Sequence, residues 1–522
     1  MRHIFCRTAG AALILHSGSQ AALFWLGGAL IRSGSASKFQ SQRKCCIDLL
    51  SGCPAAQDQK SGADVFSIIA KCNEGARKSI DSGDIAVKVT RSALGCYDKR
   101  CFWPKSADGT VNVPYTLSSA FNADEQAVIA SAIQEFTTLT CIRFVQRSVQ
   151  TDYVNILSVD GCWSYLGRVG GPQELSLLKG GCVTKGITQH ELNHVLGFVH
   201  EQTRSDRDEY VDIIWKYIPQ VYVSNFVKVE PETNNLGLAY DYSSVMHYGR
   251  YAFTNTSGQP TILPKPDSTQ DIGQRYGLSS LDIVKINKLY DCGVCGFLLS
   301  SPTGRLNSTS TPSAYPSATS CVYLIRIPAD KVFLRFDVFN LQTSPSCSSG
   351  YIKVYNGASK TSPVLLEKTC GVQKLPLLVA SGNLMLLEYF SAGPASENTF
   401  SASYSPAQCG STLTKPNGTL LSPNYPSAYP PSTNCSWVIV VPSGFKIKAL
   451  IMTLAVNPAY CRDDGRQHTA AVADICSAYY GTHTPIRQNT ATYTNTAAQR
   501  SELKWQYKHP YRYANKTKAT TS

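Results

Sequence analysis

Charged residues are few in this 522-residue chain, at 16%, and methionine is rarer still, with four copies. Apolar residues nevertheless make up 43%, which excludes a chain that is disordered throughout. A basic middle region is also missing: of the net charge of +13, residues 1–91 and 465–522 carry +6 each, which leaves +1 between them. Because a nucleic-acid groove is a basic face on a folded domain, this distribution argues against a nucleic-acid partner.

Long apolar runs are missing after the first 37 residues, so no later segment is expected to span a bilayer. Residues 1–37 combine Arg2 and Arg7 with two apolar stretches and then small residues, as secretory signals do. The polar residues 16–20 interrupt the apolar part. A signal peptide is therefore favoured over a signal-anchor, with a misplaced start site as a third possibility. The 19 cysteines agree with a secreted, extracellular protein.

Two regions precede the C-terminal half of the chain. Residues 38–91 are polar and basic and are predicted to be a removable pro-segment. Residues 92–292 are predicted to form one α+β domain. In it, Asn122-x-x-Glu125 is typical of a capping box, and the apolar spacing that follows predicts a helix over 124–138. Strands are expected at Cys141–Val145 and Val154–Ser158, and a second helix is expected to begin near Ile187.

Residues 295–522 contain an internal repeat with an offset of 114 residues. The offset relates Cys295, Cys321 and Cys347 to Cys409, Cys435 and Cys461, and it relates two Ser-Ala-Tyr-Pro segments. Short alternating runs, such as 322–327, 332–336 and 351–355, predict a small β-sandwich for each copy. The register fails after residue 464. We therefore expect a first copy at 295–408, a truncated second copy at 409–464 and an unstructured basic tail at 465–522.

Three of the nine histidines lie within eleven residues, in the segment HELNHVLGFVHE that begins at His190. On a helix, His190 and His194 share one face about 6 Å apart at 1.5 Å rise per residue, so both can bind one ion. Gly197 can take a positive φ and end the helix, which lets His200 approach from another direction. Three neutral imidazoles with an open position are typical of catalytic Zn²⁺.

Glu191 adjoins the first of these histidines. A carboxylate there can take a proton from the water that zinc activates and deliver it to a leaving amine. This chemistry is peptide-bond hydrolysis without a covalent intermediate. A lone His-Glu-x-x-His arises by chance on many helices, but the form extended by Gly197 and His200 is far more specific.

A methionine lies downstream, in Ser244-Val245-Met246-His247-Tyr248. Such sites carry a methionine-containing turn beneath the metal, although Met246 alone would more often be ordinary core packing. His247 is interpreted as structural, because three ligands are already supplied.

The stretches HELNHVLGFVHEQTRSDRD (190–208) and DYSSVMHYG (241–249) resemble the astacin family of zinc endopeptidases, within the metzincins. The resemblance covers residues 84–292. It implies a two-lobed catalytic domain with His190, His194 and His200 as zinc ligands, Glu191 as general base, and Tyr248 as a switchable ligand that stabilises the transition state. It also implies the disulfides Cys162–Cys182 and Cys141–Cys292. The close pair Cys96 and Cys101, followed by Phe102-Trp103-Pro104, resembles the hatching-enzyme branch.

The pro-segment also resembles that of the family. Gly83-Asp84 resembles its aspartate switch, in which Asp84 binds zinc and holds the enzyme latent; without the resemblance, Gly-Asp indicates only a turn. Cleavage after Arg91 would make Ser92 the new N-terminus, and Glu201 would help to anchor that terminus.

The C-terminal repeats resemble CUB domains. The resemblance implies the disulfides Cys295–Cys321, Cys347–Cys370 and Cys409–Cys435. Many CUB domains bind Ca²⁺ through an aspartate shortly after the third cysteine. Gly350 stands at that place in the first copy, which argues against calcium there, and Asp464 stands at it in the second.

Three functions follow from these patterns. The first is a secreted, latent zinc endopeptidase of hatching-enzyme type that softens an extracellular egg envelope, with CUB-mediated protein contacts to the substrate matrix. The second is a tolloid-like processing protease of matrix or growth-factor precursors. The lack of a six-cysteine EGF-like module between the CUB copies argues against it. The third is a non-enzymatic CUB binding protein. The oligomeric state is left open.

Overall fold

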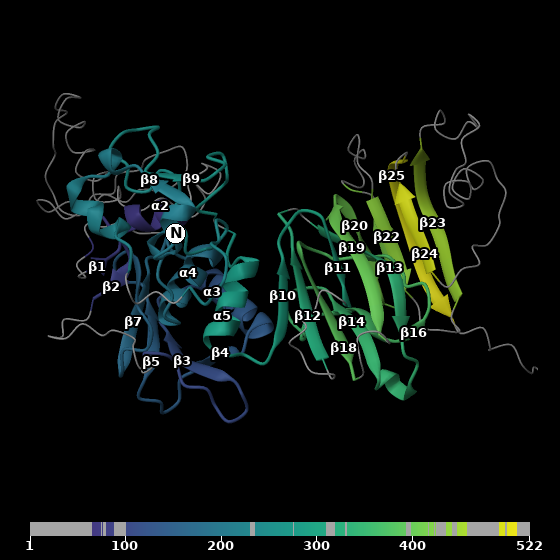
Figure 1. Cartoon of the computed structure of the whole chain (residues 1–522). Coiled ribbons are helices and arrows are strands. Elements are labelled where there is room, and N and C mark those ends of the chain that lie inside the picture. Colours follow the sequence, from purple (N-terminus) through teal and green to yellow (C-terminus); the bar gives the residue numbers. More distant parts are fainter. Residues whose placement is uncertain are drawn as a thin grey trace, which may run out of the picture. The chain divides into compact units, whose positions relative to one another are not determined.

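The computed structural model describes residues 65–74, 76, 80–87, 101–229, 235–274, 276–308, 319–328, 331–392, 398–415, 417–421, 423, 435–440, 446–456, 490–495 and 498–508 (Figure 1). The predicted leader and the predicted cleavage site after Arg91 lie outside these residues. Within them, no helix is both long enough and apolar enough to cross a membrane.

A seven-stranded mixed sheet supports the predicted protease region, with the strand order β1-β2-β6-β7-β5-β3-β4. β3, β4, β5 and β7 run parallel, and β6 is antiparallel to β7. Val111, Val113, Val154 and Ile156 are fully buried, as the alternation of these strands predicts. The strands are β1 Ile80–Asp81, β2 Ile85–Ala86, β3 Val111–Leu117, β4 Ile142–Gln146, β5 Tyr153–Leu157, β6 Cys162–Tyr165 and β7 Pro172–Leu177.

Two long helices pack against each other beside this sheet (Figure 1). Helix α3 (Ala123–Leu139) begins with the predicted capping box, in which Asn122 Oδ1 accepts from the Glu125 N–H at 2.9 Å and the Glu125 carboxylate accepts from the Asn122 N–H at 2.8 Å. The predicted helix over 124–138 is thus confirmed. Helix α4 (Lys185–Val195) begins slightly earlier than predicted, because Thr184 is its N-cap residue. Residues 186–195 of α4 are all buried, so α4 is the central helix.

The chain between α4 and the next helix consists mostly of short 3-10 turns. These turns are η2 (Glu201–Thr203), η3 (Arg207–Glu209), η4 (Trp215–Tyr217) and η5 (Gln220–Phe226), and strands β8 (Val211–Ile213) and β9 (Ile262–Pro264) pair antiparallel. Helix α5 (Ser280–Leu289) follows, with a second capping box between Ser279 and Asp282. A short helix, α2 (Val65–Cys72), comes from the predicted pro-segment.

The first C-terminal repeat is a sandwich of two sheets, as predicted. One has the order β10-β12-β18-β14-β15, and the other has the order β11-β19-β13-β16, with β17 also paired to β13. Buried residues of both sheets, including Leu334, Ile352 and Leu387, form its core. The strands are β10 Cys295–Leu299, β11 Gly304–Asn307, β12 Thr319–Arg326, β13 Lys331–Leu341, β14 Gly350–Tyr355, β15 Val364–Thr369, β16 Gly371–Val372, β17 Leu378–Val379, β18 Leu384–Ser391 and β19 Thr399–Ala407, with the 3-10 turn η7 at Pro345–Cys347.

The second repeat contains strands that the sequence did not predict. β20 (Cys409–Leu413) and β22 (Cys435–Val440) repeat the parallel pairing of β10 and β12, and β21 (Asn417–Leu421) and β23 (Lys446–Val456) lie in a second sheet. β24 (Thr490–Asn495) pairs with β22, and β25 (Ala498–Lys508) pairs with both β21 and β23. The expectation of an unstructured tail over 465–522 is therefore wrong for these two segments. Their weak apolar alternation is overridden by pairing with distant strands, since strand propensity depends on context.

Five disulfides join pairs of described residues, and each of them is a pair that the family resemblance implies. They are Cys141–Cys292, Cys162–Cys182, Cys295–Cys321, Cys347–Cys370 and Cys409–Cys435. Cys101 is also disulfide-bonded, and Cys96, its predicted partner, lies outside the described residues.

In the first repeat, the side chain of Asn398 fills the space beside Gly350, where many CUB domains have an aspartate that binds calcium. A Cβ at Gly350 would lie 2.6 Å from Asn398 Oδ1, so an aspartate has no room there. Asn398 is itself fully buried, and its Oδ1 accepts from the Gln342 N–H at 2.8 Å. Asp464, the corresponding residue of the second repeat, lies outside the described residues.

Removing the Cys141–Cys292 disulfide is expected to destabilise the protease domain more than removing Cys162–Cys182. The loops that they close span 151 and 20 residues. Treated as chain entropy, the difference is about 2 kcal/mol in the free energy of unfolding. Scanning calorimetry of the two Cys→Ala double variants checks this; equal shifts, or a larger shift for Cys162–Cys182, would contradict it.

Candidate active site

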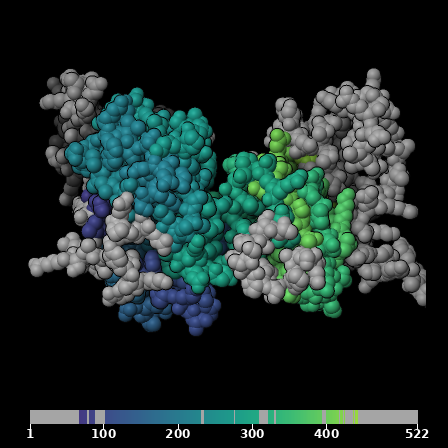
Figure 2. Space-filling view, in the orientation of Figure 1, coloured from purple at the N-terminus to yellow at the C-terminus, as the bar shows by residue number. Residues whose placement is uncertain are grey.

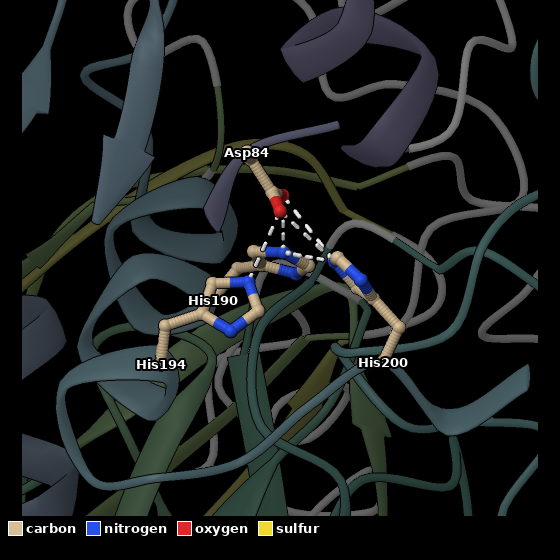
Figure 3. Close-up of side chains that lie close together, drawn as sticks. All are labelled: Asp84, His190, His194 and His200. Atoms are coloured by element: carbon tan, nitrogen blue, oxygen red, sulfur yellow. Dashed lines mark hydrogen bonds and ion pairs between the residues drawn. The ribbon is translucent and has the colours of Figure 1, made fainter. Parts of the chain in front are cut away.

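Three imidazoles from one short stretch of chain meet at one point. Helix α4 places His190 and His194 one turn apart, and His200 follows after the helix has ended (Figure 3). All three side chains are buried, and the Nε2 atoms of His190 and His200 lie 3.3 Å apart. Together with a carboxylate oxygen of Asp84, one ligand atom from each histidine lies within 4.8 Å of all the others. The structure thus brings all four predicted metal-binding residues together.

The turn between His194 and His200 depends on Gly197. Its φ is +96°, a value that side chains with a Cβ rarely adopt, and a Cβ there would lie 3.0 Å from the Phe102 ring. The Gly197 N–H donates to His194 O, and the Phe198 N–H donates to Asn193 O, so the helix ends in a closed turn. His200 can then face α4 from the side.

Residues far away in the sequence hold the buried end of α4. Gly167 N donates to His194 O at 2.7 Å, Trp103 Nε1 donates to Val195 O at 2.9 Å, and Tyr290 Oη donates to Leu196 O at 3.0 Å. The last carbonyls of a helix have no partner within the helix. These three donors therefore satisfy the end of α4 without water and fix its position.

Hydrogen bonds to main-chain carbonyls orient two of the three imidazoles. His190 Nδ1 lies 2.8 Å from Val245 O, and His194 Nδ1 lies 2.8 Å from Phe198 O. A carbonyl oxygen only accepts, so Nδ1 carries the proton in both rings. In the neutral ring this leaves Nε2 bare and facing the common point, which is the arrangement that a metal ligand needs.

Asp282 extends this orientation from α5. Its carboxylate accepts from the Val245 N–H at 2.9 Å and from Ser244 Oγ at 2.6 Å, so it holds the residue whose carbonyl accepts from His190. The sequence analysis did not identify Asp282. The Ser279-x-x-Asp282 capping box was a signal for the helix, but not for this second contact.

Asp84 of the predicted pro-segment faces all three imidazoles. Its carboxylate oxygens lie 2.9 Å from His190 Nε2, 3.3 Å from His194 Nε2 and 3.2 Å from His200 Nε2. Burial alone would raise the pKa of Asp84, but the imidazoles outweigh it and hold the pKa well below its usual range. Burial lowers the pKa of His200 to about 4, so this ring is neutral at physiological pH.

Glu191 is buried beside the histidines with no hydrogen-bond partner for either carboxylate oxygen among the described residues. Burial, and then the charge of Asp84, raise the pKa of Glu191 well above its usual range. Buried carboxylates are normally hydrogen-bonded, so an orphaned pair of oxygens beside a ligand cluster indicates a place for a solvent molecule or a reacting group.

Tyr248 lies on the other side of His200, at a ring-centroid distance of 4.6 Å. Its hydroxyl donates to Ser82 O at 2.6 Å, and its ring stacks on Phe66 of α2 at 3.6 Å. Burial raises the pKa of Tyr248 well above 10, so the phenol is protonated and can donate. The sequence analysis missed Phe66, whose part depends on a contact between the pro-segment and a distant turn.

Met246 and His247 lie beside the metal-binding residues without joining them. Met246 is buried, and its carbonyl accepts from the Glu201 N–H at 3.1 Å. His247 is also buried, and its ring bonds Tyr240 and the carbonyl of Tyr248. Burial lowers the pKa of His247 to about 4, so it is neutral.

Glu201 is paired within the protease region in this structure. Its carboxylate accepts from Lys285 Nζ at 2.6 Å, from the Asp241 N–H at 2.9 Å and from Arg204 Nη1 at 3.3 Å. Ser92, the terminus that Glu201 was expected to anchor, lies outside the described residues, so that expectation stays a prediction.

The donor set fits zinc. Three imidazoles, of which two have an Nδ1–H fixed by a carbonyl, leave their Nε2 atoms pointing at one buried place, and Asp84 supplies the negative charge that a cation there would attract. Imidazole nitrogens with a carboxylate oxygen are ordinary zinc ligands. Without the Asp84 oxygen, the three imidazoles would form the three-ligand set of a catalytic zinc site, which keeps one position open.

Comparison with known proteins agrees with this geometry. Residues 98–291 match the family described as Astacin (Peptidase family M12A), and residues 295–404 and 409–498 match the CUB domain. The chain is 47% identical to Embryonic protein UVS.2 of Xenopus laevis over 412 residues, which is 79% of each protein. It is 47% identical to Astacin-like metalloendopeptidase of Gallus gallus over 355 residues, 68% of this chain and 86% of that protein.

A solved structure also matches the protease region. It is High choriolytic enzyme 1, a hatching enzyme zinc-protease from Oryzias latipes, with 51% sequence identity and a TM-score of 0.37, and the match covers 38% of this chain and all of that one. The family match, together with the identity to these relatives and the share of each chain that they cover, shows that this chain belongs to the astacin family of metalloendopeptidases and carries CUB domains after its protease domain.

Proposed function

We propose that this metalloendopeptidase is made as a secreted, latent enzyme in which His190, His194 and His200 bind one zinc ion per protease domain. The observation that carries the proposal is the convergence of their three Nε2 atoms beside a buried carboxylate, Glu191, that has no partner among the described residues. The proposed domains keep the predicted limits, with a pro-segment at 38–91, a protease domain at 92–292 and a first CUB domain at 295–408.

Glu191 has the position and the environment of a general base. A zinc ion bound by the histidines would polarise the substrate carbonyl and acidify the attacking water. Glu191 would accept the proton from that water and return it to the leaving amine, because it adjoins His190 in the chain and its buried oxygens have no competing donor among the described residues.

Tyr248 supplies a hydrogen-bond donor next to His200, with ring centroids 4.6 Å apart. Its high pKa keeps the hydroxyl protonated, and a neutral phenol can donate to the oxygen on which negative charge develops. In the latent chain this hydroxyl is bonded to Ser82 O of the pro-segment. Removal of the pro-segment would free the phenol to turn toward the substrate.

The pro-segment would hold the enzyme latent at three places. Asp84 faces the three imidazoles, and Phe66 covers the ring of Tyr248. Asn73 joins the pro-segment to strand β6, because its side chain accepts from the Cys162 N–H at 2.7 Å and donates to Cys162 O at 2.7 Å and to Gly83 O at 2.8 Å. Strand β2 then pairs with β6 in parallel, so the pro-segment lies along the edge strand of the sheet.

The proposed substrate is a protein of an extracellular coat such as the egg envelope. The support is the likeness to a hatching enzyme zinc-protease and the predicted signal peptide. The CUB domains would supply protein contacts that hold the protease on its matrix. A tolloid-like processing protease remains the alternative, and a non-enzymatic CUB binding protein is disfavoured by the intact histidines and Glu191.

Glu191→Gln is expected to lower peptide hydrolysis by about 100-fold or more, because it removes the proton acceptor without removing a histidine. The zinc content should stay unchanged. Hydrolysis of a quenched fluorescent peptide and elemental analysis measure the two quantities on the processed chain. Glu209→Gln, at an exposed position outside the site, is the matched control. Activity within a few-fold of the wild type would contradict the role of Glu191.

Asp84→Asn in the uncleaved chain is expected to raise hydrolysis by about tenfold or more, because the charge that faces the imidazoles is lost. Adding Phe66→Ala should raise it further by releasing Tyr248. Asp81→Asn, an exposed aspartate in the same segment, should leave the chain latent. Mass spectrometry verifies that the chain is intact, and an Asp84→Asn chain as inactive as the wild type would show that latency does not depend on this carboxylate.

The processed enzyme is expected to release soluble protein from isolated egg envelopes and to leave procollagen intact, with a chelator abolishing the release. Protein assay of the supernatant and gel electrophoresis of procollagen measure the two outcomes. Cleavage of procollagen with intact envelopes would instead support the tolloid-like alternative. Binding to envelopes without any proteolysis would support the non-enzymatic one.

A further inference from the structure

The backbone of Tyr248 is held on both sides by buried side chains. Its N–H donates to Gln202 Oε1 at 3.1 Å, and its carbonyl lies 2.6 Å from His247 Nδ1. Gln202 is fully buried, and His247 is 1% exposed, so neither bond competes with water. The two bonds constrain the peptide groups on either side of the Tyr248 Cα, while the phenol itself is bonded elsewhere.

The carbonyl of Tyr248 determines which nitrogen of His247 carries the proton, and the Tyr240 hydroxyl bonds the other nitrogen. A carbonyl oxygen only accepts, so the bond to Tyr248 O requires a proton on Nδ1. The neutral ring then has a bare Nε2, which lies 2.8 Å from the Tyr240 hydroxyl and accepts from it. Tyr240 is in turn fixed by its stack on Tyr210, with ring centroids 4.8 Å apart and planes 7° apart. The tautomer of His247 is therefore built into the packing.

The same contacts join Tyr248 to the segment of the third histidine. Gln202 lies two residues after His200, on η2, and the neighbouring Glu201 N–H donates to Met246 O at 3.1 Å. The segment 201–202 thus bonds both Met246 and Tyr248. Any displacement of the turn that carries Tyr248 would have to break bonds to the chain that carries His200.

The pro-segment contacts a different part of Tyr248. Ser82 O and Phe66 touch the hydroxyl and the ring, whereas both backbone bonds come from the protease domain itself. Removal of the pro-segment would therefore release the phenol and leave the backbone bonds in place. The side chain can then rotate about a fixed Cα.

We propose that Gln202 and His247 are positioning residues that hold the Tyr248 main chain in place, with Tyr240 holding the His247 ring through a hydrogen bond to its Nε2, so that the phenol reaches the reacting oxygen by side-chain rotation alone. This inference rests on the proposed role of Tyr248 as the donor to that oxygen. A donor displaced by a fraction of an ångström loses much of its effect on the transition state.

Double-mutant cycles on the processed enzyme test the proposal. Gln202→Met removes the acceptor with little change of volume, and Tyr240→Phe removes the donor to His247. Each is expected to lower kcat by about tenfold with KM changed less than about twofold. In a Tyr248→Phe background neither should lower kcat further, because the hydroxyl that they position is already absent.

Two further variants separate positioning from general structural damage. Tyr242→Phe is the matched control, because the Tyr242 hydroxyl donates to Tyr210 O and Lys265 O and does not contact His247; it should leave kcat unchanged. His247→Asn keeps an amide donor near the place of Nδ1 and should retain more activity than His247→Leu. Thermal unfolding and zinc content of every variant show whether it is folded and loaded.

A readout other than activity uses a phosphinic peptide as a tetrahedral analogue. Gln202→Met and Tyr240→Phe should weaken its binding by about tenfold and leave the binding of the cleavage-product peptide unchanged, because the phenol contacts the tetrahedral oxygen alone. If both variants lower kcat equally in the wild-type and Tyr248→Phe backgrounds, the positioning proposal is wrong although the role of Tyr248 stands. If Tyr248→Phe itself leaves kcat unchanged, the proposed role of Tyr248 is wrong and the positioning proposal falls with it.

Discussion

Three imidazoles can bind one ion only if each has an unprotonated nitrogen facing the same point. Many contacts in the protease region hold the three rings in this arrangement. Helix α4 supplies two of the nitrogens on one face, and Gly197 turns the chain so that His200 supplies the third. Carbonyls of Val245 and Phe198 fix the protons of two rings on their outer nitrogens. The carbonyls at the end of α4 accept hydrogen bonds from residues far away in the sequence rather than from water, which fixes the position of the helix that carries His190 and His194.

The proposed latent state depends on the same geometry. A cation held by these bare nitrogens would attract an anion, and Asp84 places a carboxylate there from the predicted pro-segment. After burial, the charge of Asp84 also raises the pKa of Glu191, so the same carboxylate that faces the three histidines perturbs the proposed base. Phe66 and Ser82 occupy Tyr248 at the same time. One segment thus engages every group to which a part in hydrolysis is assigned.

The sequence predicted those features that are set by residues close together in the chain. The capping box of α3 and the spacing of the histidines on α4 depend on residues a few positions apart, and both appear in the structure as predicted. Asp282, Phe66 and Gln202 were missed because their contacts join segments far apart in the chain, where no periodicity marks them. Strands β24 and β25 were missed for the same reason, since their pairing partners are distant and their composition is a weak strand signal.

The central claim is that these three histidines bind the metal, and metal content tests it most directly. Elemental analysis of the purified, processed chain would be compared with that of His190→Gln, His194→Gln and His200→Gln variants, and with that of His247→Asn, whose histidine lies outside the cluster. The account predicts about one zinc per chain in the wild type and in His247→Asn, and a marked loss in the other three. A wild-type chain without stoichiometric zinc, or full zinc retention after replacement of His194, would contradict it.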